Sequence, residues 1–430
     1  MAVYSVVKLS QLERAKRIDA EYYKPEYLRI DSKIKRSHNY LLNQLIISFS
    51  SGKNLLQIPY DVKRVSFIRT QNVRPIIISK EGLTSVDPSV TNFDLLEEGD
   101  ILFVRVGEGV GNSSVVTPRW AKNTFSDNVI RLKLKEINPY FVVVYLNSEI
   151  GSKYLERVKK GSARSLISKE NIGLIRIYKP SEDMEIACKK MIIEAENLII
   201  KSENLYSQAE TLLLEELGLK DFKPKYQKTY TAKLSDAFTA HRIDAEYFQP
   251  AYEEVIEKIR NYPNGFSKLL KHVENIKPDF DPKKYPDNIF LYIELADIDS
   301  SIGIVHSVNK IKGEEAPSRA RRILKKGDVI VSSVEGSLEK VALIDEEHDG
   351  CLASTGFFQF RPLDILPEVL LVLSKTIVLQ SQLKKKCSGT ILTAVPKESL
   401  RDIIIPLIPL STQQKIASLV QQSHEARKRA

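Results

Sequence analysis

The sequence has few of the residues that build disulfide frameworks and metal centres. Its 430 residues include three cysteines, six histidines, three methionines and one tryptophan. The cysteines, Cys188, Cys351 and Cys387, form no closely spaced pair, and no CxxC or HxxxH spacing occurs. Neither a disulfide framework nor a zinc site is therefore predicted, and a reducing, cytoplasmic location is expected.

Long hydrophobic runs are also missing. The longest apolar stretch, IIIPLIPL at residues 403–410, has about half the length that a membrane-spanning helix needs. The N-terminal sequence MAVYSVVKLS contains no apolar segment of signal-peptide length. We therefore expect a soluble protein without a membrane partner.

Acidic residues are fewer than basic ones. The chain carries 55 Asp and Glu against 64 Lys and Arg, which gives a formal net charge of +9. This balance favours a polyanionic partner such as nucleic acid, although many basic proteins of this size bind none.

What the chain does contain is a long internal repeat. RIDAEYYKPEY at residues 17–27 returns as RIDAEYFQPAY at residues 242–252, 225 positions later. Further on, EEGDILFVRV at residues 97–106 matches KKGDVIVSSV at 325–334, and GSARSLISKENIGLIRI from Gly161 matches GTILTAVPKESLRDIII from Gly389, both at an offset of 228. The chain is therefore a tandem duplication. The matched segments, here called the frame, are kept in both copies, whereas the sequences between them differ.

A long helix is predicted between the two copies. Residues 182–217 contain no proline or glycine and are followed by Gly218, a C-terminal cap signal. Spacings of four and three residues alternate along Met184, Cys188, Met191, Ala195, Leu198, Ser202, Leu205, Ala209 and Leu212. This spacing is typical of a coiled coil about 54 Å long. The repeat places a second, shorter copy of the same seam at Ile416, Leu419, Ser423 and Ala426.

These patterns predict an α/β fold, with two mixed α/β units separated by two long antiparallel helices that form a coiled-coil spacer. Short β-branched runs follow the Gly-Asp turns, and residues 140–159 and 367–386 have helical periodicity. The predicted parts are an N-terminal segment (1–44), a first unit (45–180), the spacer helix (181–218), a linker with the second N-terminal copy (219–264), a second unit (265–410) and a C-terminal helix (411–430).

Three short motifs resemble catalytic signatures without completing one. GEGVGN at residues 107–112 lacks the third glycine of a dinucleotide-binding loop, so a tight turn is favoured. PDFDPKK at 278–284 holds Asp279 and Asp281 only two residues apart, whereas a nuclease clamps its metal from separate strands. NPY at 138–140 lacks one proline of the tetrapeptide of adenine methyltransferases and is interpreted as a helix start. No catalytic residue, cofactor or metal ligand is assigned to this chain.

Basic and small polar residues are grouped in the parts that differ between the two copies. Arg, Lys, Asn, Ser and Thr are the side chains that contact phosphates and base edges. The candidates for DNA binding, chosen by composition and loop position, are Lys63, Arg64, Arg69, Asn72, Arg105, Asn112, Arg164, Ser165, Lys283, Lys284, Arg319, Arg321, Arg322, Ser333 and Thr390.

The chain resembles the specificity subunits of Type I restriction-modification systems. The likeness is carried by RIDAEYY and RIDAEYF, by GDILFVRV and GDVIVSSV, by the repeated Lys-Glu segment and by IIIPLIPLSTQQKIASL at residues 403–419. The resemblance implies two target-recognition domains, each reading one half of a bipartite DNA site. It also implies two modification subunits, which use S-adenosylmethionine, and ATP-dependent restriction subunits as partners of a non-catalytic chain.

Two other functions stay open at this point. A self-sufficient restriction enzyme is disfavoured because two recognition-like units leave no room for two catalytic domains. A helical scaffold that binds only proteins is disfavoured by the positive charge and by divergence confined to the units. Binding of S-adenosylmethionine by the isolated chain tests the first, and salt-dependent DNA binding tests the second.

Overall fold

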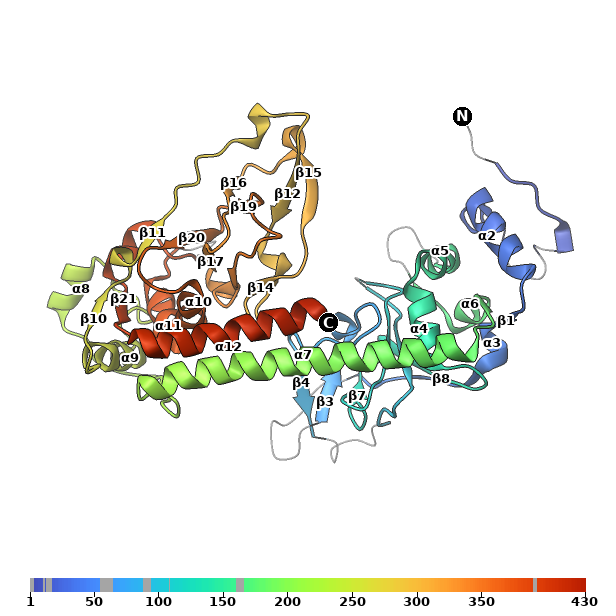
Figure 1. Ribbon diagram of the computed structural model, residues 1–430, viewed down its shortest axis with the longest axis horizontal. Coiled ribbons are helices and arrows are strands. Elements are labelled where there is room, and N and C mark those ends of the chain that lie inside the picture. The colour runs from blue at the N-terminus through green and yellow to red at the C-terminus, as the bar shows by residue number, and fades with distance from the viewer. Residues whose placement is uncertain are drawn as a thin grey trace. The chain divides into compact units, whose positions relative to one another are not determined.

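The computed structural model describes residues 4–10, 12, 18–54, 65–87, 94–107, 109–159, 166–389 and 393–430 (Figure 1). The chain divides into two compact units, Met1–Asn197 (unit 1) and Leu198–Ala430 (unit 2). Both mix helices with strands, which confirms the predicted fold class. The division falls within the long helix α7 (Glu182–Glu216), so α7 contributes residues to both units. Within the described ranges, no helix has the length and apolar character to cross a membrane.

Unit 1 is built on an antiparallel sheet with the strand order β2-β8-β5-β6. These strands are Ile46–Ser51, Val129–Leu134, Ile101–Val104 and Ser113–Val115. A smaller sheet has the order β4-β3-β7, with strands Thr84–Val86, Val65–Ile68 and Thr124–Phe125. The remaining elements are β1 (Asn39–Leu41), α3 (Leu42–Leu45), α6 (Lys169–Gly173) and β9 (Arg176–Tyr178).

Unit 2 repeats this plan with a larger second sheet. Its first sheet has the order β11-β20-β17-β18, with strands Val273–Asn275, Phe357–Pro362, Val329–Ser332 and Val341–Leu343. Its second sheet, here called the distal sheet, has the order β15-β12-β19-β16, with strands Asn309–Lys312, Ile289–Ile293, Leu352–Ser354 and Ala320–Ile323. The remaining elements are α8 (Leu234–Ala240), β10 (Phe266–Lys268), β13 (Ile298–Asp299), β14 (Ile304–Val305) and β21 (Ile404–Pro406).

The repeated Gly-Asp turn has the same geometry in both units. Gly99 and Gly327 adopt φ values of 88° and 86°, a conformation that favours glycine. The following Asp100 and Asp328 are buried, and each accepts a hydrogen bond at 2.9 Å from the backbone N–H three residues earlier. This turn therefore aims a buried, β-branched strand into each core, as the duplicated sequence predicts.

Two helical segments that the periodicity joins are each broken in the structure. Helix α4 (Pro139–Asn147) ends before Ser148, and α5 (Glu149–Val158) begins after it. The Ser148 side chain accepts a hydrogen bond from the N–H of Gly151, so it caps a new helix. In unit 2, Thr376 separates α10 (Pro367–Lys375) from α11 (Ile377–Lys386) without a side-chain cap, and its hydroxyl donates back to the Leu373 carbonyl at 3.1 Å. Apolar periodicity runs through both breaks, which is why it predicts single helices over 140–159 and 367–386.

The second half of α7 packs antiparallel to α12 (Leu410–Arg429) inside unit 2 (Figure 1). The Ser423 hydroxyl donates to the Ser202 carbonyl at 2.7 Å, and the two serine hydroxyls lie 3.1 Å apart. Fourteen residues further along α7, the Thr412 hydroxyl donates to Glu216 at 3.2 Å. Because Ser202 pairs with Ser423 and the later Glu216 pairs with the earlier Thr412, the two helices run antiparallel. Small buried side chains at 202 and 423 allow the close approach.

The buried face of α7 differs from the predicted seam. Tyr206 and Leu213 are fully buried where Leu205 and Leu212 are predicted, because both members of each pair are apolar and the three-four spacing fits either. The other predicted positions divide into buried Ser202, Ala209, Ile416, Ser423 and Ala426, half-buried Cys188, Ala195, Leu198 and Leu419, and exposed Met184 and Met191.

The repeated RIDAEY phrase forms part of the frame. Asp19 and Asp244 each accept a hydrogen bond from the backbone N–H three residues on, at 3.1 Å and 3.0 Å. A helix then begins at the proline, whereas the sequence predicts a start one residue later, at Glu26 and Ala251: the helices are α2 (Pro25–Lys35) in unit 1 and α9 (Pro250–Arg260) in unit 2.

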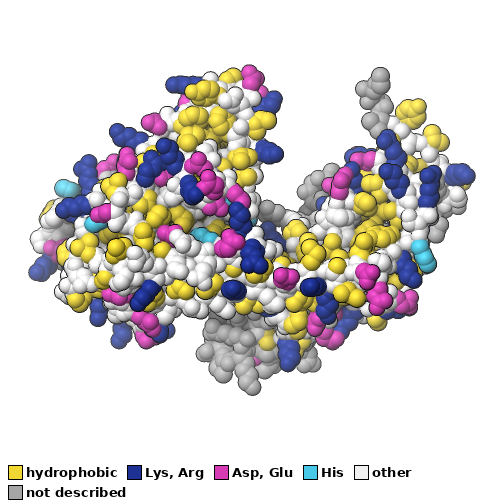
Figure 2. All heavy atoms as spheres, in the orientation of Figure 1, with side chains coloured by type: hydrophobic (Ala, Val, Ile, Leu, Met, Phe, Trp, Pro, Cys, Tyr) yellow, Lys and Arg dark blue, Asp and Glu magenta, His cyan; other side chains and the backbone are white. Residues whose placement is uncertain are grey.

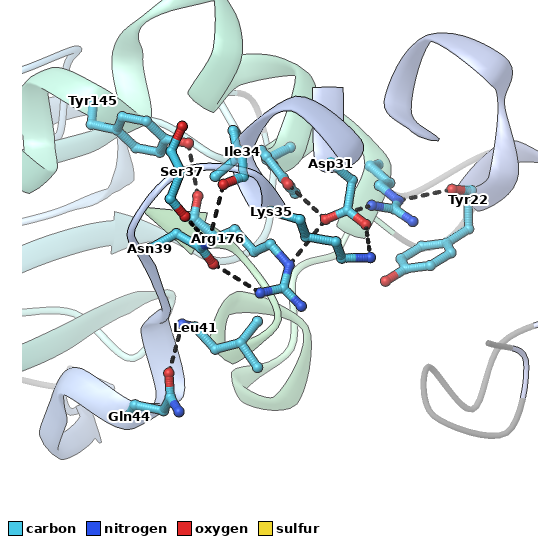
Figure 3. Close-up of polar contacts among 12 residues, drawn as sticks. Tyr22, Asp31, Ile34, Lys35, Ser37, Asn39, Leu41, Gln44, Tyr145 and Arg176 are labelled. Carbon is cyan, nitrogen blue, oxygen red and sulfur yellow. Dashed lines mark hydrogen bonds and ion pairs between the residues drawn. The ribbon is translucent and has the colours of Figure 1, made fainter. Parts of the chain in front are cut away.

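An ionic network holds α2 to its own unit (Figure 3). Asp31 of α2 is 9% exposed and accepts from the Tyr154 hydroxyl at 2.8 Å and from Arg176 Nε at 3.2 Å. Lys35 Nζ lies 2.5 Å and Arg157 Nη1 3.9 Å from the Asp31 carboxylate. Burial by itself would raise the pKa of Asp31, but the hydrogen bonds from Lys35 and Tyr154 hold that pKa below its usual value.

Candidate nucleic-acid interface

The distal sheet of unit 2 carries aromatic and basic side chains on one loop. The loop precedes β12 and contains the short 3-10 helix Pro282–Lys284. Figure 2 shows hydrophobic and basic side chains close together on the part of unit 2 that carries β12, β15 and β16. We call Phe280, Lys283, Lys284, Tyr285, Phe290 and Arg321 the aromatic-basic patch.

Three rings form the apolar part of the patch. Phe280 stacks on Tyr285 with ring centroids 5.9 Å apart and an interplanar angle of 6°. Phe290 meets Phe280 edge to face at 5.8 Å. Tyr285 remains 50% exposed. An exposed ring supported from behind by a second ring is a rigid surface on which a sugar or a base can pack.

The loop under these rings is held by specific contacts. Asp281 accepts from the N–H of Lys283 at 3.3 Å, and Arg321 Nη1 lies 3.3 Å from the same carboxylate. A Cβ on Gly313 would lie 2.0 Å from the Tyr285 carbonyl oxygen, so only glycine fits where the two backbones meet. The patch is therefore preorganised by its supporting contacts.

Exposed lysines lie on the loop of the rings and on the neighbouring strand, where Lys312 pairs with Glu314 at 3.7 Å. Lys283 and Lys284 are exposed, as are Lys310 and Lys312 on the edge strand β15. Lysines at alternate positions of an edge strand also prevent pairing with another sheet, which is their commonest structural role. Arg319 is exposed and pairs with Glu294 at 3.2 Å. Ammonium groups next to stacked rings match the phosphates and sugars of a nucleic-acid backbone.

Unit 1 has a smaller counterpart of this region. Asn72 and its repeat partner Asp297 each accept from the backbone N–H three residues earlier, at 3.0 Å and 2.8 Å. Asn72 also donates to the carbonyls of Ser79 and Glu81 and is fully buried. We therefore correct its predicted role in DNA contact: this amide is fully used in holding its own loop. The neighbouring Arg69 donates to the Gly82 carbonyl at 2.8 Å and is half-buried.

Arg105 and Ser333 occupy equivalent positions after the central strands β5 and β17. Arg105 is exposed, while the Ser333 hydroxyl donates to the Gly356 carbonyl at 2.9 Å. Asn112 lies at the end of the adjoining glycine-rich turn, and its side chain donates to the Val73 carbonyl at 3.4 Å. Ser333 and Asn112 are thus bonded to the backbone of their own unit, whereas Arg105 is exposed to solvent.

Arg322 is buried and requires a second correction. It is 5% exposed and donates to the Ile276 carbonyl at 2.6 Å. Burial lowers the pKa of its guanidinium to about 10. The side chain supports the sheet from within, whereas its neighbour Arg321 reaches the patch. Composition does not separate these two residues, because their burial depends on strand alternation.

The other predicted contacts lie outside the described residues: Lys63, Arg64, Arg164, Ser165 and Thr390. Conversely, composition alone misses Phe280, Tyr285, Phe290, Lys310 and Lys312. In the sequence, the patch is indicated by the two aromatic residues, Phe280 and Tyr285, that flank the lysines in PDFDPKKY. The similarity of this segment to a nuclease motif draws attention to its aspartates instead.

The motifs with catalytic resemblance have structural roles. Gly107, Gly109 and Gly111 all adopt positive φ in the turn between β5 and β6. The Asn138 side chain accepts from the N–H of Tyr140 at 3.0 Å, which confirms that NPY begins a helix. Among the described residues, no group of three or more His, Cys, Asp or Glu side chains has a geometry that could hold a metal ion.

Comparison with known proteins finds one family and several relatives. The Type I restriction modification DNA specificity domain matches residues 279–426. The specificity subunit of the Type I restriction enzyme HindI from Haemophilus influenzae is 25% identical over 151 residues, which are 34% of this chain and 32% of that subunit. Residues 279–426, which match the family model, include the distal sheet and its patch.

Two solved structures are also similar. The HsdS subunit from Thermoanaerobacter tengcongensis is 32% identical over 39% of this chain and 44% of its own, with a TM-score of 0.33. The S subunit of a Type-I restriction-modification system from M. genitalium is 12% identical over 91% of both chains, with a TM-score of 0.42. The chain thus spans about a third of the HindI subunit and less than half of the first solved relative.

Proposed function

We propose that this chain is a Type I restriction-modification specificity subunit, a non-catalytic protein that reads an asymmetric, bipartite DNA site, because residues 279–426 match the DNA specificity domain of that family. Each unit would read one half of the site. The aromatic-basic patch of unit 2 would contact the sugar-phosphate backbone of one half and position the loops that read its bases.

One observation carries this proposal: the same frame occurs twice and supports two different distal sheets. The Gly-Asp turns, the RIDAEY helices and the helix pairs match at offsets of 225 to 228. Among the described residues, the second sheet of unit 1 has three strands and the distal sheet of unit 2 has four, and the three-ring patch belongs to unit 2. Two equal frames suit two copies of one partner, and two different sheets suit two different half-sites.

The partners follow from the same proposal. Two modification subunits would dock on the two equal frames, and restriction subunits would join the assembled complex. S-adenosylmethionine, ATP and Mg²⁺ would be bound by these partners and not by this chain. The cysteine content favours the reducing cytoplasm, where such a complex would meet DNA.

Methylome mapping of the assembled methyltransferase tests the proposal. The chain is co-expressed with the modification subunit, and methylated adenines are located across the host genome. We expect a single asymmetric motif of two parts separated by an unspecified gap. The Lys283→Ala/Lys284→Ala/Tyr285→Ala variant should reduce methylation at every site and lower the salt dependence of DNA binding by about two ion equivalents.

A matched variant on the same unit serves as control. Lys268→Ala/Lys271→Ala removes two charges outside the distal sheet and should leave methylation near wild type. A palindromic motif would contradict the asymmetric, bipartite site. An equal loss of methylation in both variants would contradict the proposed role of the patch.

A further inference from the structure

Unit 1 has an open apolar groove of about 410 Å³ beside the start of α7. Lys33, Ser37 and Tyr178 form part of its wall, and Ile150, Met184 and Cys188 contribute side chains from α5 and α7. Ile150 is 44% exposed and Met184 is 41% exposed. Large apolar side chains gathered around one hollow mark a binding surface more often than scattered ones do.

In unit 2, the repeat counterparts of the apolar residues of this groove are covered. Ile150 corresponds to Val378, and Cys188 corresponds to Ile416, each 228 positions later. Both counterparts have no exposed surface. The same frame therefore covers this surface in one unit and leaves it open in the other.

The segment that fills the counterpart is the end of α7 and the residues after it. The Glu216 carboxylate accepts from the Tyr262 hydroxyl at 2.7 Å and from the Thr412 hydroxyl at 3.2 Å. Tyr262 and Thr412 are the counterparts of Ser37 and Met184, which line the open groove. Lys258, the counterpart of Lys33, lies over the Phe222 ring at 5.6 Å. The repeat thus maps a helix end onto the position of the groove.

The covering segment has a simple chemistry. Leu213 and Leu219 are buried in the core of unit 2. Gly218 adopts φ of 64°, and the N–H of Leu219 donates to the Leu214 carbonyl at 2.7 Å, which closes the helix. An apolar helix face, an acidic residue in the last turn and a terminal glycine therefore suffice to fill this site.

We propose that the groove of unit 1 binds the C-terminal end of an amphipathic helix supplied by a partner protein. The helix would place leucine side chains on Ile150, Met184 and Cys188. Its last-turn carboxylate would lie near the exposed ammonium of Lys33, as charge complementarity favours. This site is separate from the DNA-contacting patch, and the inference does not depend on the proposed DNA recognition.

A peptide with the sequence of residues 205–222 is the probe, because that segment fills the counterpart site. Its binding to the full chain is measured by fluorescence anisotropy. We expect saturable binding that weakens at least tenfold in Ile150→Glu, since a carboxylate would enter the apolar groove. The control Ile47→Glu changes a residue that is 64% exposed elsewhere on unit 1 and should bind the peptide as wild type does.

Cys188 allows a second readout. A peptide with Leu213→Cys, activated as its thiopyridyl disulfide, is offered to the chain. The Cys188 thiolate attacks the peptide sulfur, forms the mixed disulfide and releases thiopyridone. Cys351 and Cys387 are buried, so adduct formation should be fast in wild type, slow in Ile150→Glu and absent in Cys188→Ser.

Three outcomes would overturn the inference. They are no saturable binding, equal binding to Ile150→Glu, and adduct formation that is independent of Ile150. If the peptide does not bind while sedimentation shows a dimer of the full chain that Ile150→Glu dissociates, the occupant is a second copy and the proposed partner helix is wrong.

Discussion

The two units attach their RIDAEY helix with different chemistry at equivalent positions. In unit 1, Asp31, Tyr154 and Arg176 form a buried ionic network. The counterparts in unit 2 are Ile256, Gln382 and Ile404, where Gln382 bonds the backbone of Ile404 in both directions, at 2.8 Å and 3.0 Å. All three members differ together, so the frame depends on complementary filling of the position and not on any one residue.

The largest effect is expected from breaking one member of the ionic set. Asp31→Ala leaves the buried Arg157 and the half-buried Arg176 without their carboxylate and should destabilise unit 1 by about 3 kcal/mol. Ile256→Ala, at the equivalent position of unit 2, removes a partly buried side chain and should cost about 1 to 2 kcal/mol. Hydrogen exchange of peptides from α2 and α9 across a urea series measures both.

Exchanging the whole set sharpens the same comparison. The triple variant Asp31→Ile/Tyr154→Gln/Arg176→Ile gives unit 1 the residues of unit 2 and should recover most of the stability that Asp31→Ala loses. If the triple variant is as unstable as the single one, the two attachments are not interchangeable.

A smaller effect is expected at the helix crossing of unit 2. Ser202→Leu forces a large side chain against Ser423, where the helices approach closely, and should destabilise unit 2 by about 1 to 3 kcal/mol. Ser207→Leu changes an exposed position of the same helix and should be nearly neutral. Thermal unfolding with peptide-resolved hydrogen exchange should show the loss in α12 and leave α2 and α5 unaffected.

The smallest expected effect is a difference in acid sensitivity. Because the folded pKa of Asp31 is lowered, its stabilising contribution is complete above the unfolded value of about 3.9. It is lost as pH falls through the folded pKa. Unit 1 of the wild type should therefore lose more stability between pH 5 and pH 3 than unit 1 of the triple variant. If the stability of unit 1 falls equally steeply with pH in both proteins, Asp31 is not the cause of the acid sensitivity.

The repeat predicts the frame because a feature that occurs in both copies at a constant offset is predicted twice, independently. The starts of α7 and α12 and the two Gly-Asp turns lie at the spacing that the sequence predicts. The side-chain level is harder to predict. Leu205 and Tyr206 both fit a three-four spacing, and only packing selects Tyr206. Asn72 and Arg322 look like DNA contacts by composition, yet burial commits both to their own backbones. Burial of this kind arises from tertiary structure and leaves no local pattern.

The helix crossing at Ser202 and Ser423 has a consequence for the order of folding. The two residues are 221 positions apart in the chain. At a translation rate of about 5 to 20 residues per second, Ser423 is synthesised roughly 10 to 45 seconds after Ser202. The face of α7 that contains Tyr206, Ala209 and Leu213 therefore stays uncovered until α12 has been synthesised. Ile192, on the part of α7 that belongs to unit 1, can be buried earlier. During synthesis, this uncovered apolar face exposes the nascent chain to misassociation and to capture by chaperones.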